Sequence, residues 1–233
     1  MNILALDTSM GACSAAVLRA GDGARRLHAL HVEMPRGHAE ALMPMVEEVL
    51  ADAEIEARDL DLIAATVGPG SFTGVRIAIA AARGLALATG ARVFGTDSLT
   101  VMARAARLAG AAPKGPFKGP FAIAVDARRD MLYLGVYDAD LHKLDGPLLV
   151  APDEAIALLP ATLRLAVGNG AQALAEAGSA RGRAIETMLP TLQPSAAALA
   201  EIALASSESS GLLRPLYLRP PDAKPQAPAL ERR

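Results

Sequence analysis

One pattern occurs twice along this chain and constrains the fold more than any other feature. In each copy an apolar run ends in an aspartate, the chain turns, and a second apolar run returns. The aspartates are Asp7 and Asp126, and a valine follows each of them by ten residues. Each copy therefore predicts two antiparallel strands joined by a turn. The predicted strand pairs cover residues 2–6 with 13–18 and residues 121–125 with 131–137.

A second feature follows each strand pair in the same order. Residues 67–70 and 167–170 both read Val-Gly-X-Gly after an apolar run, and a helix-like stretch follows each. Glycine supplies the backbone angles of a tight turn between a strand and a helix. Two shared features in one order indicate an internal duplication, and hence a two-lobed α/β fold. The expected parts are a first lobe (1–105), a second lobe (106–190), a helix near 194–207 that packs back on the first lobe, and a tail (208–233).

Two helices of the first lobe carry apolar surface that must be covered. Residues 38–53 place apolar side chains on one stripe, and residues 74–89 are small and apolar almost all round. Both observations fit burial within this chain and docking on a partner equally well. For the docking hypothesis we expect Val46→Arg or Ala82→Arg to break association while the lobe stays folded. The candidate interface residues are His38, Leu42, Met45, Val46, Val49, Arg76, Ala82 and Arg83.

Two strand-ending aspartates in duplicated lobes also suggest a nucleotide cleft between the lobes. Carboxylates there would hold a cation, and tight turns would offer N–H groups to phosphates. However, Gly11 is the only glycine of the first turn, so we expect a vestigial cleft without tight ATP binding. The alternative is that each aspartate simply forms a turn. The candidate cleft residues are Asp7, Thr8, Ser9, Asp126, Arg128, Gly168 and Gly170.

The remaining motifs do not indicate catalysis. Residues 68–74 resemble a phosphate loop but lack its lysine, and Ser71 does not lie in a Gly-X-Ser-X-Gly turn. His28 and His31 lie three apart on a predicted strand and so point to opposite faces. His142 is isolated in the sequence. We therefore predict no catalytic residue and no metal site.

Composition narrows the setting. The 233 residues are 52% apolar, carry a net charge of −2, and include one cysteine and no tryptophan. This balance does not suggest strong autonomous binding to nucleic acid, and a single cysteine excludes an internal disulfide. The first residues lack a basic segment, so no signal peptide is expected, and Arg76 and Arg83 make residues 74–89 a poor membrane span. We expect a cytoplasmic protein.

Several motifs together carry a family resemblance. In chain order these motifs are DTS (7–9), CS (13–14), PRGH (35–38), VGPGSFTGVR (67–76), DAR (126–128) and YLR (217–219). The chain resembles the TsaB (YeaZ) family, which takes part in bacterial tRNA threonylcarbamoyladenosine biosynthesis. The glycine-rich block is the most specific of these motifs, and the resemblance covers nearly the whole chain.

The resemblance implies a duplicated fold of the actin, hexokinase and Hsp70 type. It also implies a non-catalytic scaffold that works with a catalytic paralogue, TsaD, and a small ATPase, TsaE, to modify the adenosine next to the anticodon. In the family, the first-lobe helices bundle with the paralogue or with a second copy in a homodimer. The complex uses ATP and binds the tRNA. This chain is expected to meet the tRNA only indirectly, through the complex, and no membrane is expected to be involved. The alternatives are an ATP-dependent carbamoyl or phosphoryl transferase and a metallopeptidase.

Overall fold

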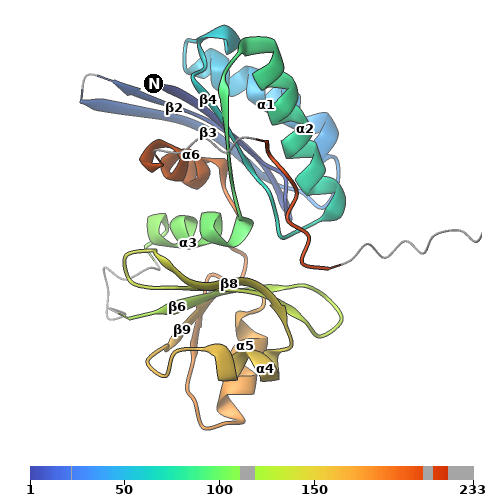
Figure 1. Ribbon diagram of the computed structural model, residues 1–233, viewed down its shortest axis with the longest axis vertical. Helices are drawn as coiled ribbons and strands as arrows, with labels where there is room; N and C mark the ends of the chain where they lie inside the picture. The colour runs from blue at the N-terminus through green and yellow to red at the C-terminus, as the bar shows by residue number, and fades with distance from the viewer. Residues whose placement is uncertain (22, 111–118, 207–211, 220–233) are drawn as a thin grey trace, which may run out of the picture.

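Two five-stranded sheets, one above the other, form the framework of the protein (Figure 1). The computed structural model describes residues 1–21, 23–110, 119–206 and 212–219. Residues 110–120, whose three glycines and three prolines predict a linker between the lobes, lie mostly outside the described residues, as do residues 220–233 of the predicted tail.

The two sheets share one topology. The first has the order β3-β2-β1-β4-β5 and the second the order β8-β7-β6-β9-β10. In each, three antiparallel strands come first, and two further strands then add parallel to the central one. This repetition confirms the predicted two-lobed, duplicated α/β fold. The strands are β1 (Asn2–Asp7), β2 (Ala12–Gly21), β3 (Ala24–Glu33), β4 (Leu62–Thr66), β5 (Arg92–Thr96), β6 (Phe121–Asp126), β7 (Leu132–Tyr137), β8 (Lys143–Val150), β9 (Leu165–Val167) and β10 (Glu186–Met188).

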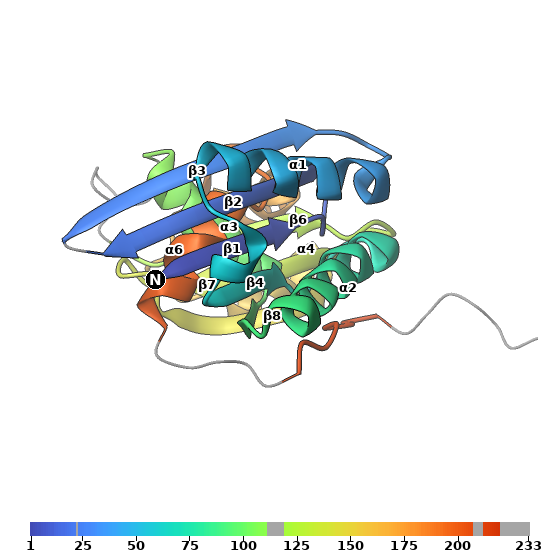
Figure 2. The ribbon, with the colours of Figure 1, turned by 90° about the horizontal axis from the view of Figure 1, so that it is seen from above.

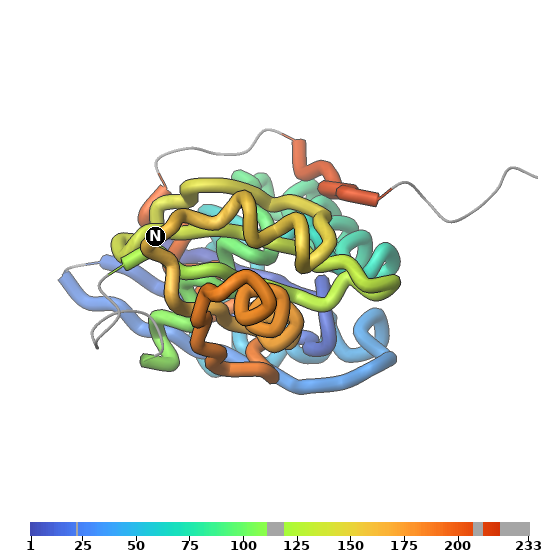
Figure 3. Tube along the Cα trace, turned by 90° about the horizontal axis from the view of Figure 1, so that it is seen from below, coloured from blue at the N-terminus to red at the C-terminus, as the bar shows by residue number. Residues whose placement is uncertain are grey.

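The helices repeat as well. Helices α1 and α2 lie side by side on the outer face of the first sheet (Figure 2), and α4 and α5 pack together on the outer face of the second (Figure 3). Helices α3 and α6 pack against each other between the sheets. The helices are α1 (His38–Asp52), the 3-10 turn η1 (Ala57–Asp59), α2 (Phe72–Thr89), α3 (Ser98–Leu108), α4 (Pro152–Leu158), α5 (Ala171–Ser179) and α6 (Ala196–Ala205).

Helix α6 belongs in space to the first sheet, although it follows the second in sequence. Its buried alanines and Leu199 pack against residues of β1, β2 and β4. Ser195 caps the helix, its hydroxyl accepting a hydrogen bond from the Ala198 N–H at 3.3 Å. The chain then returns to the first lobe again, because Leu213 is only 1% exposed and joins its core. Residues 212–219 are therefore a packed segment, which the prediction of a tail from residue 208 missed.

Candidate functional site

The turn after β1 is a closed polar cluster. Asp7, Thr8 and Ser9 have no exposed surface. The Asp7 carboxylate accepts hydrogen bonds from the hydroxyls of Ser9, at 2.8 Å, and Thr66. Burial raises the pKa of Asp7, against the opposing effect of these hydrogen bonds. A carboxylate so enclosed has no open side for a cation.

The glycine-rich block explains why this turn is closed. A Cβ on Gly70 would lie 2.1 Å from the Ser9 carbonyl oxygen, and one on Gly74 would lie 2.0 Å from that of Thr8. The Thr8 hydroxyl donates to the Gly74 carbonyl at 2.6 Å. Glycine is required here because the start of α2 rests directly on the backbone of the turn. The block is a packing element, and its two glycines hold it against Asp7–Ser9.

The corresponding turn of the second lobe is open. Asp126 is exposed, and its carboxylate accepts a hydrogen bond from the Arg128 N–H at 2.7 Å, within its own turn. Gly168 and Gly170 instead pack on β6, where an added Cβ would lie 2.5 Å from the Ala124 oxygen and 3.0 Å from the Val125 carbonyl carbon, respectively. The cleft candidates therefore form two separate turns. Asp7 is enclosed and Asp126 caps its own turn, so the two carboxylates do not present a shared cation site.

Two surface hollows lie away from these turns. One is lined by residues of α5 and β10, including Gln172 and Glu186, and another by residues near the chain start, including Asn2 and Arg19. Neither is lined by the cleft candidates of either turn. Cys13, in the predicted strand at 13–18, is buried, and burial raises the pKa of its thiol to about 11. At neutral pH it is a protonated core side chain.

The histidines differ from one another in setting. His28 and His31 lie on strand β3, as predicted, and three residues apart they face opposite sides. The prediction that His142 is isolated was wrong. Its Nδ1 lies 3.0 Å from the Asp138 carboxylate, and Asp140 joins them in a group that could hold a metal ion. Desolvation raises the pKa of Asp138, but the hydrogen bonds from His142 and Asp140 lower it by more. The pKa of Asp138 therefore lies below its usual value.

The predicted interface residues require a correction. The stripe on α1 is 7% exposed or less, and Ala82 on α2 is fully buried. These side chains pack against β1, β2 and β4 within the first lobe, so the amphipathic stripe faces this chain's own sheet. The buried residues are Leu42, Met45, Val46, Val49 and Ala82. They cannot meet a partner while the lobe is folded.

The other predicted interface residues lie at the margins of the two helices. His38 begins α1 and is half-buried. Arg76 and Arg83 are exposed on α2, and the Arg83 guanidinium donates to the Leu213 carbonyl. Arg83 therefore holds the returning segment 212–219 in place.

The outward sides of α1 and α2 are uncovered. Leu87 is 89% exposed and Met43 is 39% exposed, although both are large apolar side chains. Around Leu87, α2 presents Ala80, Gly84 and Ala88, which follow one another at intervals of four residues and so share one face. Only 28% of α2 is buried, and α2 alone among the described residues is long and apolar enough to cross a membrane, by length and composition. We call this exposed surface (Met43, Ala80, Gly84, Leu87 and Ala88) the outer helix face.

The returning segment 212–219 builds a cluster at the start of α2. The Phe72 and Tyr217 rings stack with centroids 5.3 Å apart. The Arg76 guanidinium lies 3.5 Å from the Phe72 ring centre, and its Nε donates to the Tyr217 hydroxyl at 2.7 Å. Of this cluster only Arg76 was among the predicted site residues, although the motif at 217–219 contains Tyr217. Only the fold brings Arg76 and Tyr217, which are 141 residues apart in sequence, into contact.

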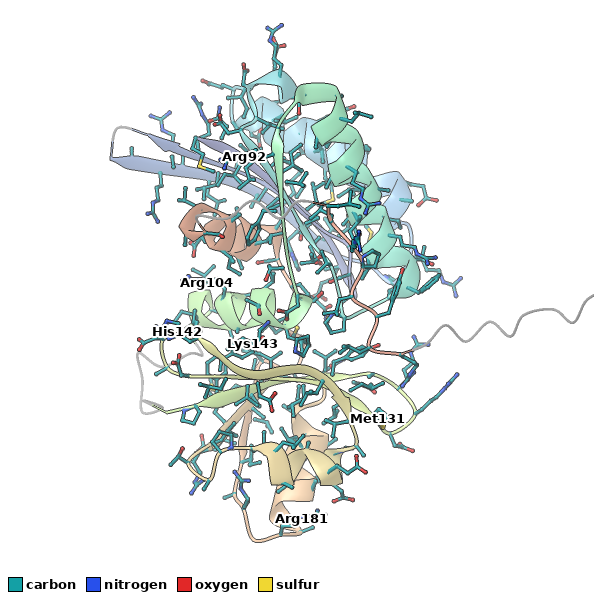
Figure 4. The ribbon with its side chains drawn as sticks, viewed as in Figure 1. Arg92, Arg104, Met131, His142, Lys143 and Arg181 are labelled. Carbon is teal, nitrogen blue, oxygen red and sulfur yellow. The ribbon has the colours of Figure 1, made fainter. Side chains whose placement is uncertain are left out.

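An ion pair joins the two lobes under α3. Lys143 Nζ lies 2.5 Å from the carboxylate of Asp97, which is buried and also caps α3 by accepting from the Thr100 N–H. Figure 4 shows Lys143 pointing from the second sheet toward α3, with Arg104 on that helix. Arg104 pairs loosely with Glu201 of α6 at 3.9 Å. The Lys143–Asp97 pair therefore joins the two lobes, whereas the Arg104–Glu201 pair holds α3 against α6.

Known proteins resemble this chain in sequence and in fold. A family model described as TsaD, tRNA N6-adenosine threonylcarbamoyltransferase, matches residues 32–213. YeaZ from Pseudomonas aeruginosa has a solved structure with a TM-score of 0.75, is 31% identical, and is matched over 93% of this chain and 99% of that one. The tRNA threonylcarbamoyladenosine biosynthesis protein TsaB of Escherichia coli is 37% identical over 60% of this chain and 56% of its own length. An uncharacterized protein of Mycobacterium tuberculosis is 34% identical over 97% of this chain and 95% of its own.

Proposed function

Because this chain belongs to the TsaB (YeaZ) family of tRNA threonylcarbamoyladenosine biosynthesis proteins, we propose that it is the non-catalytic scaffold of the modifying complex. Its catalytic partner is a TsaD-like paralogue, and a TsaE-like ATPase joins them. The complex works in the cytoplasm and uses ATP that this chain does not hold tightly. Alone, the chain forms a homodimer through the surface that otherwise receives the paralogue.

The closed turn at Asp7 is the observation that carries the non-catalytic role. A nucleotide-dependent transferase needs an accessible carboxylate for a cation and open backbone N–H groups for phosphate. Here the hydroxyls of Ser9 and Thr66 donate hydrogen bonds to the Asp7 carboxylate, and Gly70 packs against the Ser9 carbonyl oxygen. The site that would act on ATP is filled by the chain's own side chains and backbone.

The outer helix face supports the docking role. Leu87 and Met43 would gain stability by leaving water, at about 25 cal/mol for each Å² of apolar surface buried. Ala80, Gly84 and Ala88 leave room for the backbone of a partner helix to approach closely. A surface with protruding and small apolar side chains suits helix-against-helix packing better than contact with water.

Size-exclusion chromatography with and without the paralogue tests this proposal, together with tRNA modification by the mixture. The chain alone is expected to modify no tRNA and to restore activity to the paralogue. Leu87→Arg should abolish both co-elution and activation, because it places a charge in a desolvated contact. The matched control is Leu158→Arg, at a 47% exposed leucine of α4 in the second lobe, which should leave both intact.

Two outcomes would contradict the proposal. Modification of tRNA by the chain supplied only with the adenylate-forming enzyme would show that the chain is itself catalytic. Full co-elution and activation by a folded Leu87→Arg protein would show that the outer helix face is not the docking surface.

A further inference from the structure

Three arginines and two aromatic rings gather where the returning segment crosses from the first lobe to the second. Arg76 comes from α2, Arg128 from the turn after β6, and Arg219 from the returning segment. In Figure 1 this segment runs down beside α2 toward the second lobe. We define the arginine–aromatic edge as Phe72, Arg76, Arg128, Tyr217 and Arg219.

We propose that the arginine–aromatic edge contacts RNA directly. The inference rests on the proposed function, since the RNA is the tRNA substrate of the complex. It goes beyond that function because it gives this chain its own part in holding the substrate, where the sequence suggested only an indirect role.

The charge of the edge is the first argument. Within the described part of the chain, no carboxylate forms an ion pair with Arg76, Arg128 or Arg219. Arg219 even approaches Arg128, with its Nη2 3.4 Å from the Arg128 carbonyl oxygen. Asp126 and Asp130 flank Arg128 in sequence; the Asp126 carboxylate accepts from the Arg128 backbone N–H, and Asp130, among the described residues, forms no ion pair with Arg128. Cations held together without acidic partners attract a polyanion, and phosphates of a nucleic acid provide one.

The rings are the second argument. Phe72 is 46% and Tyr217 is 42% exposed, in a chain with only four phenylalanines and three tyrosines. The Arg76 guanidinium lies over the Phe72 ring, so two partly exposed rings and a guanidinium form one stacked, cationic cluster at the surface. Unpaired bases of RNA loops stack on aromatic rings and on guanidinium planes. An anionic membrane would be attracted by the charge but has no group that uses the stack, so the observations favour RNA.

The location is the third argument. Arg76 lies one helical turn from Ala80 of the outer helix face. A partner that docks along α2 would therefore lie beside the arginine–aromatic edge, and an RNA held at that margin of the partner would be within reach of the edge. The edge also includes Arg128 of the second lobe, so it extends the RNA-binding surface of the complex across both lobes of this chain.

Fluorescence anisotropy with a labelled tRNA that carries the target adenosine tests the proposal, using the full chain and its complex with the paralogue. Affinity is measured over a range of salt concentrations. Arg76→Glu with Arg219→Glu should lower the slope of log affinity against log salt by about two, one for each lost phosphate contact. The matched control reverses two exposed arginines of β3, Arg25→Glu with Arg26→Glu, and should leave the slope unchanged.

Two further variants separate the edge from the attachment of the returning segment. Arg128→Glu lies in the second lobe and leaves the Arg76–Tyr217 contact intact, and it should lower the slope by about one. Tyr217→Leu should lower affinity at fixed salt by about fivefold or more, because a base loses its stacking partner. Unchanged thermal unfolding and co-elution with the paralogue establish that each variant is folded and assembled.

The outcomes distinguish the two proposals. If wild-type complex forms and is active while the edge variants bind tRNA as wild type does, the inference is overturned and the scaffold role stands. If the paralogue is not activated at all, the scaffold role fails whatever the RNA affinity. Binding to vesicles of anionic lipid that the edge variants abolish, with tRNA binding unaffected, would assign the edge to a membrane and overturn the RNA inference.

Discussion

The two lobes have the same strand order but have diverged in the helices and turns that they carry. Helix α2 has 18 residues and an uncovered apolar face, whereas its counterpart α5 has nine. Asp7 is fully buried, whereas Asp126 is exposed at the equivalent strand end. Sheet topology is therefore what the two lobes still share. The first lobe has closed its turn and lengthened the helix that we propose docks on a partner.

The glycine turns show the divergence most clearly. Gly68 and Gly168 have nearly equal φ angles of 102° and 106°, in the left-handed region that favours glycine. The second glycines differ. A Cβ on Gly70 would lie 2.1 Å from a backbone oxygen, whereas one on Gly170 would first meet the movable end of Leu132, at 2.7 Å.

Alanine at these two equivalent positions gives the largest expected difference between the lobes. Gly70→Ala should lower the free energy of unfolding by about 4 kcal/mol or more, or prevent soluble expression, because the backbone on both sides must move. Gly170→Ala should cost about 1–3 kcal/mol, since the Leu132 side chain can shift and the backbone carbons of Val125 and Ala124, at 3.0 and 3.1 Å, need to move only slightly. Urea unfolding measures both. Equal midpoints for the two variants would show that the first turn is no more tightly closed than the second.

The next effect tests which side of α1 faces the sheet. Val46 is 1% exposed and its neighbour Glu47 is exposed. Val46→Arg should cost about 4 kcal/mol, because it buries an unpaired charge. The sequence-based expectation was a folded lobe that fails to associate, and the burial of Val46 contradicts it. Glu47→Arg, by contrast, should unfold like wild type. A Val46→Arg protein with wild-type stability would require the helix to face the other way.

The sequence was sufficient to predict the architecture, but not to predict which side of each helix faces the sheet. The strand pair around each of Asp7 and Asp126 and the repeated Val-Gly-X-Gly turn are local sequence patterns. Together they predicted the duplicated fold. Both sides of α2 are apolar and small, so only the position of the sheet shows that Ala82 is buried and Leu87 exposed. Half-exposed β8 and the short α4 lack periodic signals and went unpredicted. The contact of Tyr217 with Arg76 joins residues 141 apart in sequence, beyond any local pattern.

The enclosed carboxylate predicts a pH dependence for the first lobe. Burial raises the pKa of folded Asp7 above its ordinary value of 3.8. The ionised form is therefore disfavoured in the folded protein, and its cost is present above the folded pKa. As the pH falls from the folded pKa to 3.8, that cost disappears at up to about 1.4 kcal/mol for each pH unit.

Asp7→Asn measures this effect, because the amide has the same shape and carries no charge. Its carbonyl oxygen can still accept from the Ser9 N–H, and the Ser9 and Thr66 hydroxyls can rotate to accept from its NH₂. We expect the variant to gain stability relative to wild type as the pH rises above 3.8. Urea unfolding of both proteins at several pH values gives the difference. A difference that stays constant with pH would mean that Asp7 ionises in the fold as readily as in the unfolded chain.

The smallest effect compares glycines within the corresponding helices α2 and α5. A Cβ on Gly84 of α2 would meet nothing within 4 Å, whereas one on Gly178 of α5 would lie 2.9 Å from the Arg183 oxygen. Gly84→Ala should therefore raise the free energy of unfolding by about 0.5–1 kcal/mol, through better helix propensity and a less flexible unfolded chain. Gly178→Ala should lower it, since the backbone at Arg183 must give way.

Gly84→Ala also tests why a glycine lies on the outer helix face at all. If the face packs closely against a partner helix, the added methyl group should weaken association with the paralogue although it stabilises the isolated chain. Thermal unfolding of the chain alone and titration calorimetry with the paralogue measure these opposite changes. Positions 80 and 88 already carry the methyl group of alanine. Only position 84, a glycine, can therefore test how closely the backbone of a partner helix approaches α2. A variant that is both more stable and equally well bound would show that the partner leaves space at Gly84, and that Leu87 carries the contact without close backbone packing.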